Sequence, residues 1–163
     1  MGALMLPAAD WQAPDWQRLW LSIWSTKRPW RSLALVPAGP GTAPDIITQL
    51  AVSMANAGNL YVKKPIHVAD ASGILHTRQV PSFSAELTRY ISAPSLVLLA
   101  LPSLKESSTS LALAKAADCA LLCIMRGQMV RADAKKTVSQ IGASHFIGSA
   151  LFYLASDPPE KGD

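Results

Sequence analysis

SLALVPAGPGTAPDIITQLAVSMANAG, residues Ser32–Gly58, is the stretch that decides the fold. Its apolar run, Ser32–Val36, predicts a buried strand. The Gly- and Pro-rich segment Pro37–Pro44 predicts a loop. Asp45–Ala57 has the spacing of a helix, with Gly58 at a C′-like position that ends it. A strand, a glycine loop and a helix in this order can bind phosphate, because backbone N–H groups and a helix N-terminus surround the anion.

The loop of this stretch lacks the side chains that act on a nucleotide. A functional P-loop ends in Gly-Lys-Ser/Thr, in which the lysine binds the β- and γ-phosphates and the hydroxyl binds Mg²⁺. Here Thr42, Ala43 and Pro44 occupy the corresponding places, and the proline also removes a backbone N–H. We therefore interpret Gly39, Gly41 and Thr42 as a degenerate phosphate loop and expect no catalytic residues.

Strand-like and helix-like segments alternate along the rest of the chain. The apolar run Ser95–Leu101 predicts a central strand covered on both faces. The alternation predicts an α/β fold with a doubly wound, mostly parallel sheet, right-handed crossovers and helices on both faces. The other expected strands are Ile66–Val68, Cys119–Met125 and Phe146–Phe152. The other expected helices are Pro14–Trp24, Ala85–Ile91, Thr109–Ala117 and Arg131–Ile141, and Ala71–Ser84 is expected to be a loop.

The chain has 163 residues, enough for one domain with a substantial core. Half of the residues are hydrophobic and only 16% are charged, which excludes a disordered chain. We expect an N-terminal segment, 1–30, that contains loose residues 1–13 and a Trp-rich amphipathic helix. A degenerate P-loop ATPase-like domain, 31–155, and a polar tail, 156–163, follow it.

Charge and hydropathy indicate where the protein works. No apolar run is long enough to span a membrane, and the N-terminus lacks the pattern of a signal peptide. We therefore predict a cytoplasmic protein, for which a peripheral place at the inner membrane stays open. The net charge of +4, much of it from Lys27, Arg28 and Arg31, favours a solvated basic rim over a nucleic-acid or anionic-lipid surface. A solvated face is also the interpretation of the basic residues Arg126, Arg131, Lys135 and Lys136.

The five tryptophans of the chain all lie within its first 30 residues. One stripe of the expected first helix is apolar and carries Trp16, Leu19, Trp20, Ile23 and Trp24. This stripe can pack on its own domain, or it can bind a partner, since tryptophan is enriched in interface hot spots and at membrane interfaces. The predicted partner-binding residues are Asp15, Trp16, Arg18, Trp20 and Trp24.

The cysteines and histidines indicate no metal or cofactor site. Cys119 and Cys123 share one face of an apolar strand, which is typical of a buried, unreactive pair. No cysteine or carboxylate lies at metal-ligand spacing from His67, His76 or His145. We expect neither a metal nor a cofactor.

The second half of the chain resembles a known family in a set of short motifs. The motifs occur in the family's order and are Leu113-Ala114, Ala117-Asp118, Arg131-Ala132-Asp133 and Gly142-Ala143. Residues 37–58 align in the same register, and Asp15 and Arg18 match the start of a ring-forming Glu-x-x-Arg-x-x-Arg segment. Over roughly residues 15–152 the chain resembles the catalytic domain of bacterial tyrosine kinases (BY-kinases) and the wider MinD/ParA group of P-loop ATPases.

The chain departs from this family at the positions that carry catalysis. The catalytic lysine is replaced by Ala43, the Mg²⁺-binding hydroxyl by Pro44 and the Walker-B aspartate by Ala100. The last arginine of the ring segment is Leu21, and Tyr153 stands alone where BY-kinases have a tyrosine cluster. The chain is therefore predicted not to be an enzyme.

The resemblance implies a role in bacterial exopolysaccharide synthesis and export, of capsule, cellulose or a similar polymer. There BY-kinases contact membrane co-polymerase proteins. The predicted function is a pseudo-ATPase or pseudokinase that acts as a structural or regulatory subunit through protein–protein binding, with a homo-oligomer as a further option. One alternative is a MinD/ParA-like ATPase for positioning or cell division that uses a displaced lysine, for which Lys63, Lys64 and Lys105 are candidates. Another is a protein of that superfamily that acts on membrane or DNA through its basic faces.

Overall fold

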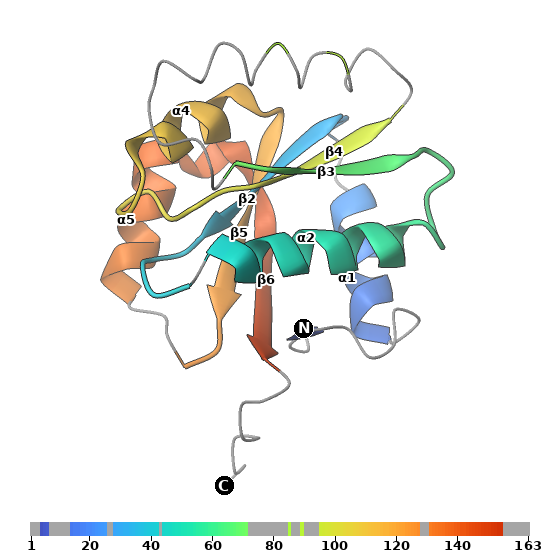
Figure 1. Ribbon diagram of the computed structural model, residues 1–163, viewed down its shortest axis with the longest axis horizontal. Helices are drawn as coiled ribbons and strands as arrows, with labels where there is room; N and C mark the ends of the chain where they lie inside the picture. Colours follow the sequence, from blue (N-terminus) through green and yellow to red (C-terminus); the bar gives the residue numbers. More distant parts are fainter. Residues whose placement is uncertain are drawn as a thin grey trace, which may run out of the picture.

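The computed structural model describes residues 4–6, 14–25, 28–42, 44–71, 85, 89, 95–127 and 131–154. Strands and helices alternate along this part of the chain (Figure 1). The elements are β1 (Leu4–Leu6), α1 (Pro14–Trp24), β2 (Ser32–Pro37), α2 (Pro44–Gly58), β3 (Ile66–Asp70), β4 (Leu96–Ala100), α4 (Ser108–Ala116), β5 (Cys119–Met125), α5 (Arg131–Ile141), the 3₁₀ turn η2 (Ala143–His145) and β6 (Phe146–Leu154).

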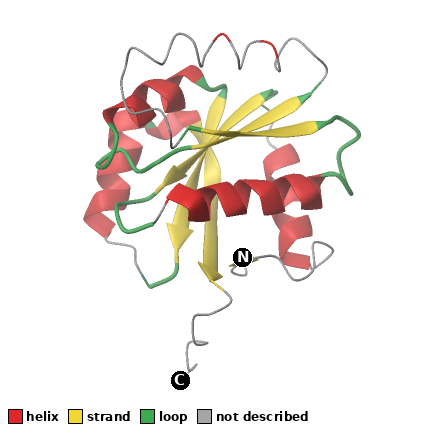
Figure 2. Cartoon of the chain, in the orientation of Figure 1, coloured by secondary structure: helices red, strands yellow, loops and turns green. Residues whose placement is uncertain are grey.

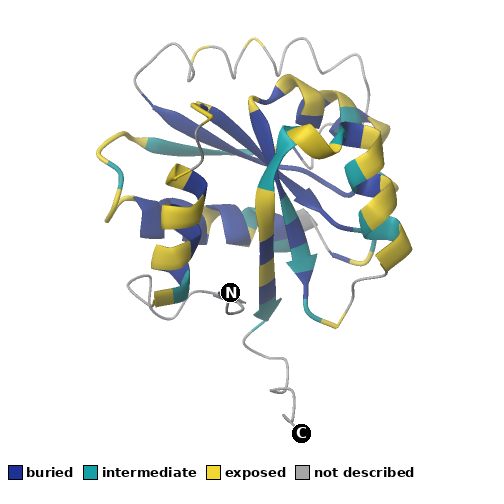
Figure 3. Ribbon diagram, turned by 180° about the vertical axis from the view of Figure 1, so that it is seen from behind, coloured by how far each residue is buried: buried dark blue, intermediate teal, exposed yellow. Residues whose placement is uncertain are grey.

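The strands form one six-stranded sheet in the order β1-β6-β5-β2-β4-β3, and every neighbouring pair is parallel. The strand β2 lies between β5 and β4, where Leu35 pairs with Leu121 on one side and Ala100 on the other. Every residue of β2 and β4 is buried (Figure 3), as expected of parallel strands covered on both faces. The predicted α/β fold is confirmed.

Helices cover both faces of the sheet (Figure 2). Alternate side chains of β2 point to opposite faces, as the period of a strand requires. Leu33 and Leu35 belong to one hydrophobic cluster with α1 and α2. Ala34 and Val36 belong to a second cluster with α4 and α5. The two layers confirm the prediction of helices on both faces.

Most element bounds agree with those predicted from the sequence. The bounds of α1, β5 and α5 are as predicted, and α4 is shifted by one residue. The strands β3 and β6 extend further than predicted, to Asp70 and Leu154. Ala43, residues 72–84 and the tail 156–163 lie outside the described residues, as does most of Ala85–Ile91, of which Ala85 and Arg89 are described and helical.

The prediction that residues 1–13 are loose is wrong for Leu4–Leu6. These three residues form the edge strand β1, which pairs in parallel with β6. Leu4 is buried in the same hydrophobic cluster as the inner face of α1 and the sheet. Three residues show no periodicity in a sequence, so only the pairing with β6 defines this strand. The N-terminal segment and the sheet therefore share one core.

Gly58 does not have the C′ role predicted for it. It is the last residue of α2 and is not among the glycines with a positive φ. A Cβ added there would lie 2.5 Å from both Ile66 Cδ1 and Trp20 Cζ2. Glycine is needed at this position because α2 packs closely against β3 and α1.

Asp118 joins the beginnings of β2 and β5. Its carboxylate oxygen Oδ2 accepts hydrogen bonds from the backbone N–H groups of Arg31 and Ser32, at 2.8 and 3.1 Å. In return, the backbone N–H of Asp118 donates to the Ser32 hydroxyl at 2.9 Å. The aspartate of the family-like Ala117-Asp118 motif therefore has a structural role, which is to hold the first residues of two central strands together.

Both cysteines are buried on the α1/α2 side of β5, as predicted, and they form no disulfide. Burial, assisted by the Asp118 carboxylate and opposed by Arg28, raises the pKa of Cys119 to about 12. Burial also raises the pKa of Cys123, against a backbone hydrogen bond with Val36 that lowers it. The thiol, rather than the reactive thiolate, is the form that the fold stabilises.

These shifts predict a loss of stability in alkaline solution. The unfolded thiols ionise near pH 8.5, whereas the folded ones stay protonated, so their contribution is complete below that pH and falls as the pH rises toward 12. The loss is up to about 1.4 kcal/mol per thiol for each pH unit. Urea unfolding between pH 7 and pH 10 measures it. The double variant Cys119→Ala, Cys123→Ala should show a shallower pH dependence, and equal slopes would contradict the prediction.

Within the part of the chain that the structure describes, no helix has the length and apolar character needed to cross a bilayer.

Candidate functional site

The loop after β2 lies at the point where the chain turns to opposite faces of the sheet. β2 leads into α2 on one face, whereas its neighbours β4 and β5 lead into α4 and α5 on the other. In open α/β sheets, ligands bind at the carboxyl ends of the strands at such a switch point. The loop after β2, which contains Gly39, Gly41 and Thr42, is therefore at the place where folds of this kind bind ligands.

Hydrogen bonds hold the beginning of this loop against β5 and α5. The backbone N–H of Ala38 donates to the Cys123 carbonyl at 2.9 Å, which continues the pairing of β2 with β5. The Thr137 hydroxyl of α5 donates to the Ala38 carbonyl at 3.1 Å. Further along, Gly41 has a φ of 102°, a conformation that glycine adopts without strain. Thr42 is buried.

Asp133, in the first turn of α5, packs directly on the loop. A Cβ added at Gly39 would lie 3.0 Å from the Asp133 Cβ and 3.4 Å from its Oδ2. A side chain at Gly39 would therefore crowd Asp133, which would have to shift by a few tenths of an ångström. The same contact places a carboxylate beside the loop.

A cavity of about 160 Å³ opens between this loop, the segment after β4 and one side of α5. Its lining includes two lysines, one carboxylate and several neutral polar groups. The lining residues are Gly39, Pro40, Ser103, Leu104, Lys105, Asp133, Lys136, Thr137 and Gln140. The buried Ser103 lies in a turn in which its hydroxyl accepts a hydrogen bond from the Glu106 N–H at 3.3 Å.

Pro44 and Ala100, which the resemblance to P-loop ATPases assigns to catalytic positions, lie at this edge together with Asp45. Pro44 is the first residue of α2, so the first helical position lacks an N–H. Ala100 is buried at the end of β4 and pairs with Asp70 of β3. Asp45 lies in the first turn of α2.

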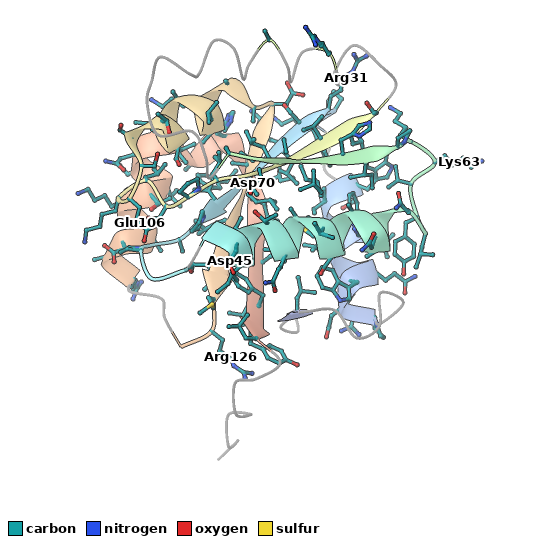
Figure 4. The ribbon with its side chains drawn as sticks, viewed as in Figure 1. Arg31, Asp45, Lys63, Asp70, Glu106 and Arg126 are labelled. Atoms are coloured by element: carbon teal, nitrogen blue, oxygen red, sulfur yellow. The ribbon has the colours of Figure 1, made fainter. Side chains whose placement is uncertain are left out.

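The lysines proposed as substitutes lie at opposite edges of the sheet. Lys63 and Lys64 precede β3, at the amino edge, and cannot act at the loop after β2. Figure 4 shows Lys63 on one side of the molecule and Asp45, Asp70 and Glu106 on the other. Lys105 does line the cavity, and so does Lys136 of α5, which the sequence did not single out for this edge. No short-range signal marks Lys136, because α5 reaches the cavity through the topology of the sheet.

The prediction that Trp16 and Trp20 bind a partner is wrong for this fold. Their side chains are only 3% and 1% exposed, and both belong to the core cluster between α1, α2 and the sheet. The Trp20 indole N–H donates to the Met54 carbonyl of α2 at 2.9 Å. The tryptophan stripe of α1 therefore packs on its own domain.

The other three predicted partner-binding residues are accessible. Asp15 and Arg18 form an ion pair of 3.5 Å on the outer face of α1. Trp24, at the end of α1, is 50% exposed, and its ring contacts Trp30 edge to face at a centroid distance of 6.3 Å.

The histidines are not brought together. His67 is half-buried on β3. The ring of His145, also half-buried, forms a hydrogen bond with the Ala114 carbonyl at 2.8 Å. His76 lies outside the described residues. Among the residues whose positions are given, no three His, Cys, Asp or Glu side chains form a group that could hold a metal ion.

Comparison with known proteins identifies the architecture. No protein-family model and no curated protein sequence matches the chain. Among solved structures, the chain is similar to one titled "BceF Tyrosine Kinase Domain", with a TM-score of 0.51 and 12% sequence identity. The match covers 76% of this chain and 69% of that one. The fold is BY-kinase-like. This α/β fold is consistent with the P-loop NTPase-like fold predicted from the sequence.

Proposed function

We propose that this protein is a non-catalytic pseudo-ATPase that acts through protein–protein binding as a structural or regulatory subunit of a bacterial exopolysaccharide synthesis and export machine. The BY-kinase-like fold, together with the replaced catalytic positions, supports the proposal of a non-catalytic pseudo-ATPase. The role in exopolysaccharide synthesis and export is the one that the resemblance to BY-kinases implies. Of the predicted partner-binding residues, Asp15, Arg18 and Trp24 remain candidates, because they are accessible on α1.

The observation that carries this proposal is the replacement of the catalytic lysine, hydroxyl and carboxylate positions by Ala43, Pro44 and Ala100, and the charges beside the loop agree with it. In P-loop enzymes the phosphates lie against the loop, and catalysis depends on a lysine, a metal and its ligands that stabilise their charge. Here a carboxylate occupies the side of the loop that faces α5, and Asp45 adds a second one in the first turn of α2. Both carboxylates complement the dipoles of their own helices and repel a polyphosphate.

The size of the cavity supports the same proposal. At about 160 Å³ it is smaller than the roughly 300–1,000 Å³ of typical small-molecule sites. Pro44 offers no N–H at the start of α2, and Ala100 offers no carboxylate for a metal. The described residues do not fit Mg-ATP.

Isothermal titration with Mg-ATP tests the proposal. We expect no saturable heat at ATP concentrations up to about 1 mM, which corresponds to a binding free energy weaker than about −4 kcal/mol. An active P-loop ATPase titrated under the same conditions is the positive control. Saturable binding in the micromolar range would contradict the proposal.

The second candidate function is a MinD/ParA-like nucleotide-binding ATPase, which one observation favours. Lys105 and Lys136 both line the cavity beside Gly39, so a cation could reach an anion there from a displaced position. If the titration shows binding, the double variant Lys105→Ala, Lys136→Ala should abolish it. The variant Lys63→Ala, Lys64→Ala, at the opposite edge of the sheet, is the matched control and should retain it.

A further inference from the structure

The amino edge of the sheet carries a second groove, apart from the cavity beside Gly39, and Trp24 is the one partner-binding candidate in its lining. The segment between α1 and β2 and the segment between α2 and β3 meet there, because both helices end at this edge. The groove has a volume of about 210 Å³. Its lining residues are Ile23, Trp24, Arg28, Pro29, Trp30 and Lys64.

The groove and its surroundings are basic. Two of its lining residues are cations and none is a carboxylate. Lys63, exposed beside Lys64, and Arg31, exposed before β2, extend the positive charge. In Figure 4, Lys63 lies at the right edge of the molecule and Arg31 at its top, whereas Glu106 lies at the left. The carboxylate of Asp118 also lies at this edge, where it accepts hydrogen bonds from the backbone N–H groups of Arg31 and Ser32.

Large apolar side chains are exposed next to these cations. Trp24 and Leu60 are each 50% exposed and Tyr61 is 40% exposed, at the ends of α1 and α2. The ring of Trp24 packs edge to face on the ring of Trp30, which is buried. Tryptophan and tyrosine favour the interface of a bilayer, because each has an apolar body and a polar tip. Lysine and arginine beside them keep their charged ends in water while their stems contact apolar surface.

We propose that this amino edge docks on an anionic membrane surface. Trp24, Leu60 and Tyr61 enter the headgroup region, while Lys63, Lys64 and neighbouring arginines attract the lipid phosphates. A bilayer is favoured over a nucleic acid because the exposed apolar groups include leucine, which neither stacks on bases nor binds phosphate.

Docking in this way turns the carboxyl edge of the sheet, with its cavity and the end of β6, away from the membrane. Because the two edges are opposite, the proposal does not depend on whether the cavity binds nucleotide. The titration with Mg-ATP and the experiment below can therefore fail independently.

Vesicle flotation of the full chain tests the proposal. We expect binding to phosphatidylcholine vesicles that contain phosphatidylglycerol, little binding to phosphatidylcholine alone, and release at raised salt. The variant Lys63→Glu, Lys64→Glu should weaken binding about 30-fold or more, since each lysine near an anionic surface contributes roughly 1 kcal/mol. Thermal unfolding followed by circular dichroism verifies that the variants remain folded.

The matched control is Arg131→Glu, Lys135→Glu, which makes the same charge change on exposed residues of α5 outside the cavity lining. It should weaken binding less than about threefold, because both residues lie near the start of α5, at the carboxyl edge of the sheet. A second variant, Trp24→Ala, should weaken binding without changing its salt dependence. Equal losses in the two charge-reversal variants, equal binding to both vesicle types, or no binding at all would overturn the proposal. So would a result in which the Trp24→Ala variant loses self-association, measured by light scattering, while no variant affects vesicle binding.

Discussion

Replacing Trp20 by alanine should lower the free energy of unfolding by about 4 kcal/mol. The side chain is almost fully buried between α1, α2 and the sheet, and truncation of a buried aromatic typically costs about 3–5 kcal/mol. The variant also loses the hydrogen bond from the indole N–H to the Met54 carbonyl. Because domains are usually stable by about 5–15 kcal/mol, the loss should be visible as a large shift in a urea unfolding curve.

Trp24→Ala is the control for this prediction. Trp24 lies one helical turn further along α1, is half exposed and keeps an aromatic contact with Trp30, so its removal should cost about 1 kcal/mol. If Trp20→Ala left the unfolding curve unchanged and instead abolished binding to a partner, the burial of Trp20 described here would be contradicted.

The tryptophan stripe shows what a sequence can and cannot predict about a helix. The spacing of Trp16 and Trp20 predicted the helix with its correct bounds, because an amphipathic stripe follows the helical period. The same stripe arises whether it packs on its own domain or on another molecule. Only the tertiary contacts with α2, such as the approach of Trp20 to Gly58, decide between the two.

The central strands were predictable for a similar reason. Parallel strands covered on both faces are continuous apolar runs, and Cys119–Met125 is such a run, bounded by charged residues. The edge strand β1 has no such signal, since its three residues become a strand through pairing with β6.

The candidate site could be predicted only in its local part. The loop around Gly39 and Gly41 was evident from the succession of strand, glycines and helix. The contact of Asp133 with Gly39 and the place of Lys136 in the cavity join positions almost one hundred residues apart, and no spacing within either segment indicates them. The topology of the sheet brings α5 to the loop.

Replacing Asp118 by alanine should lower the free energy of unfolding by about 3 kcal/mol. The carboxylate accepts two backbone hydrogen bonds, and bonds to charged groups contribute about 1.5–3 kcal/mol each, less where they are exposed to water. The variant leaves the N–H of the buried Ser32 without its acceptor. Because both donors precede or begin β2, we expect the pairing of β2 with β5 to fray from this end. Faster hydrogen exchange at the first pairs, Leu33 with Cys119, would report it.

Asp118→Asn is the matched control for this prediction. Its amide oxygen can accept the same N–H groups without the charge, so the loss of stability should be about half that of the alanine variant. If the two variants were equally unstable, the negative charge rather than the hydrogen bonds would hold the strands. If both were as stable as the original chain, the bonds between Asp118 and β2 would not contribute to the fold, and the Ala117-Asp118 motif would need a different explanation.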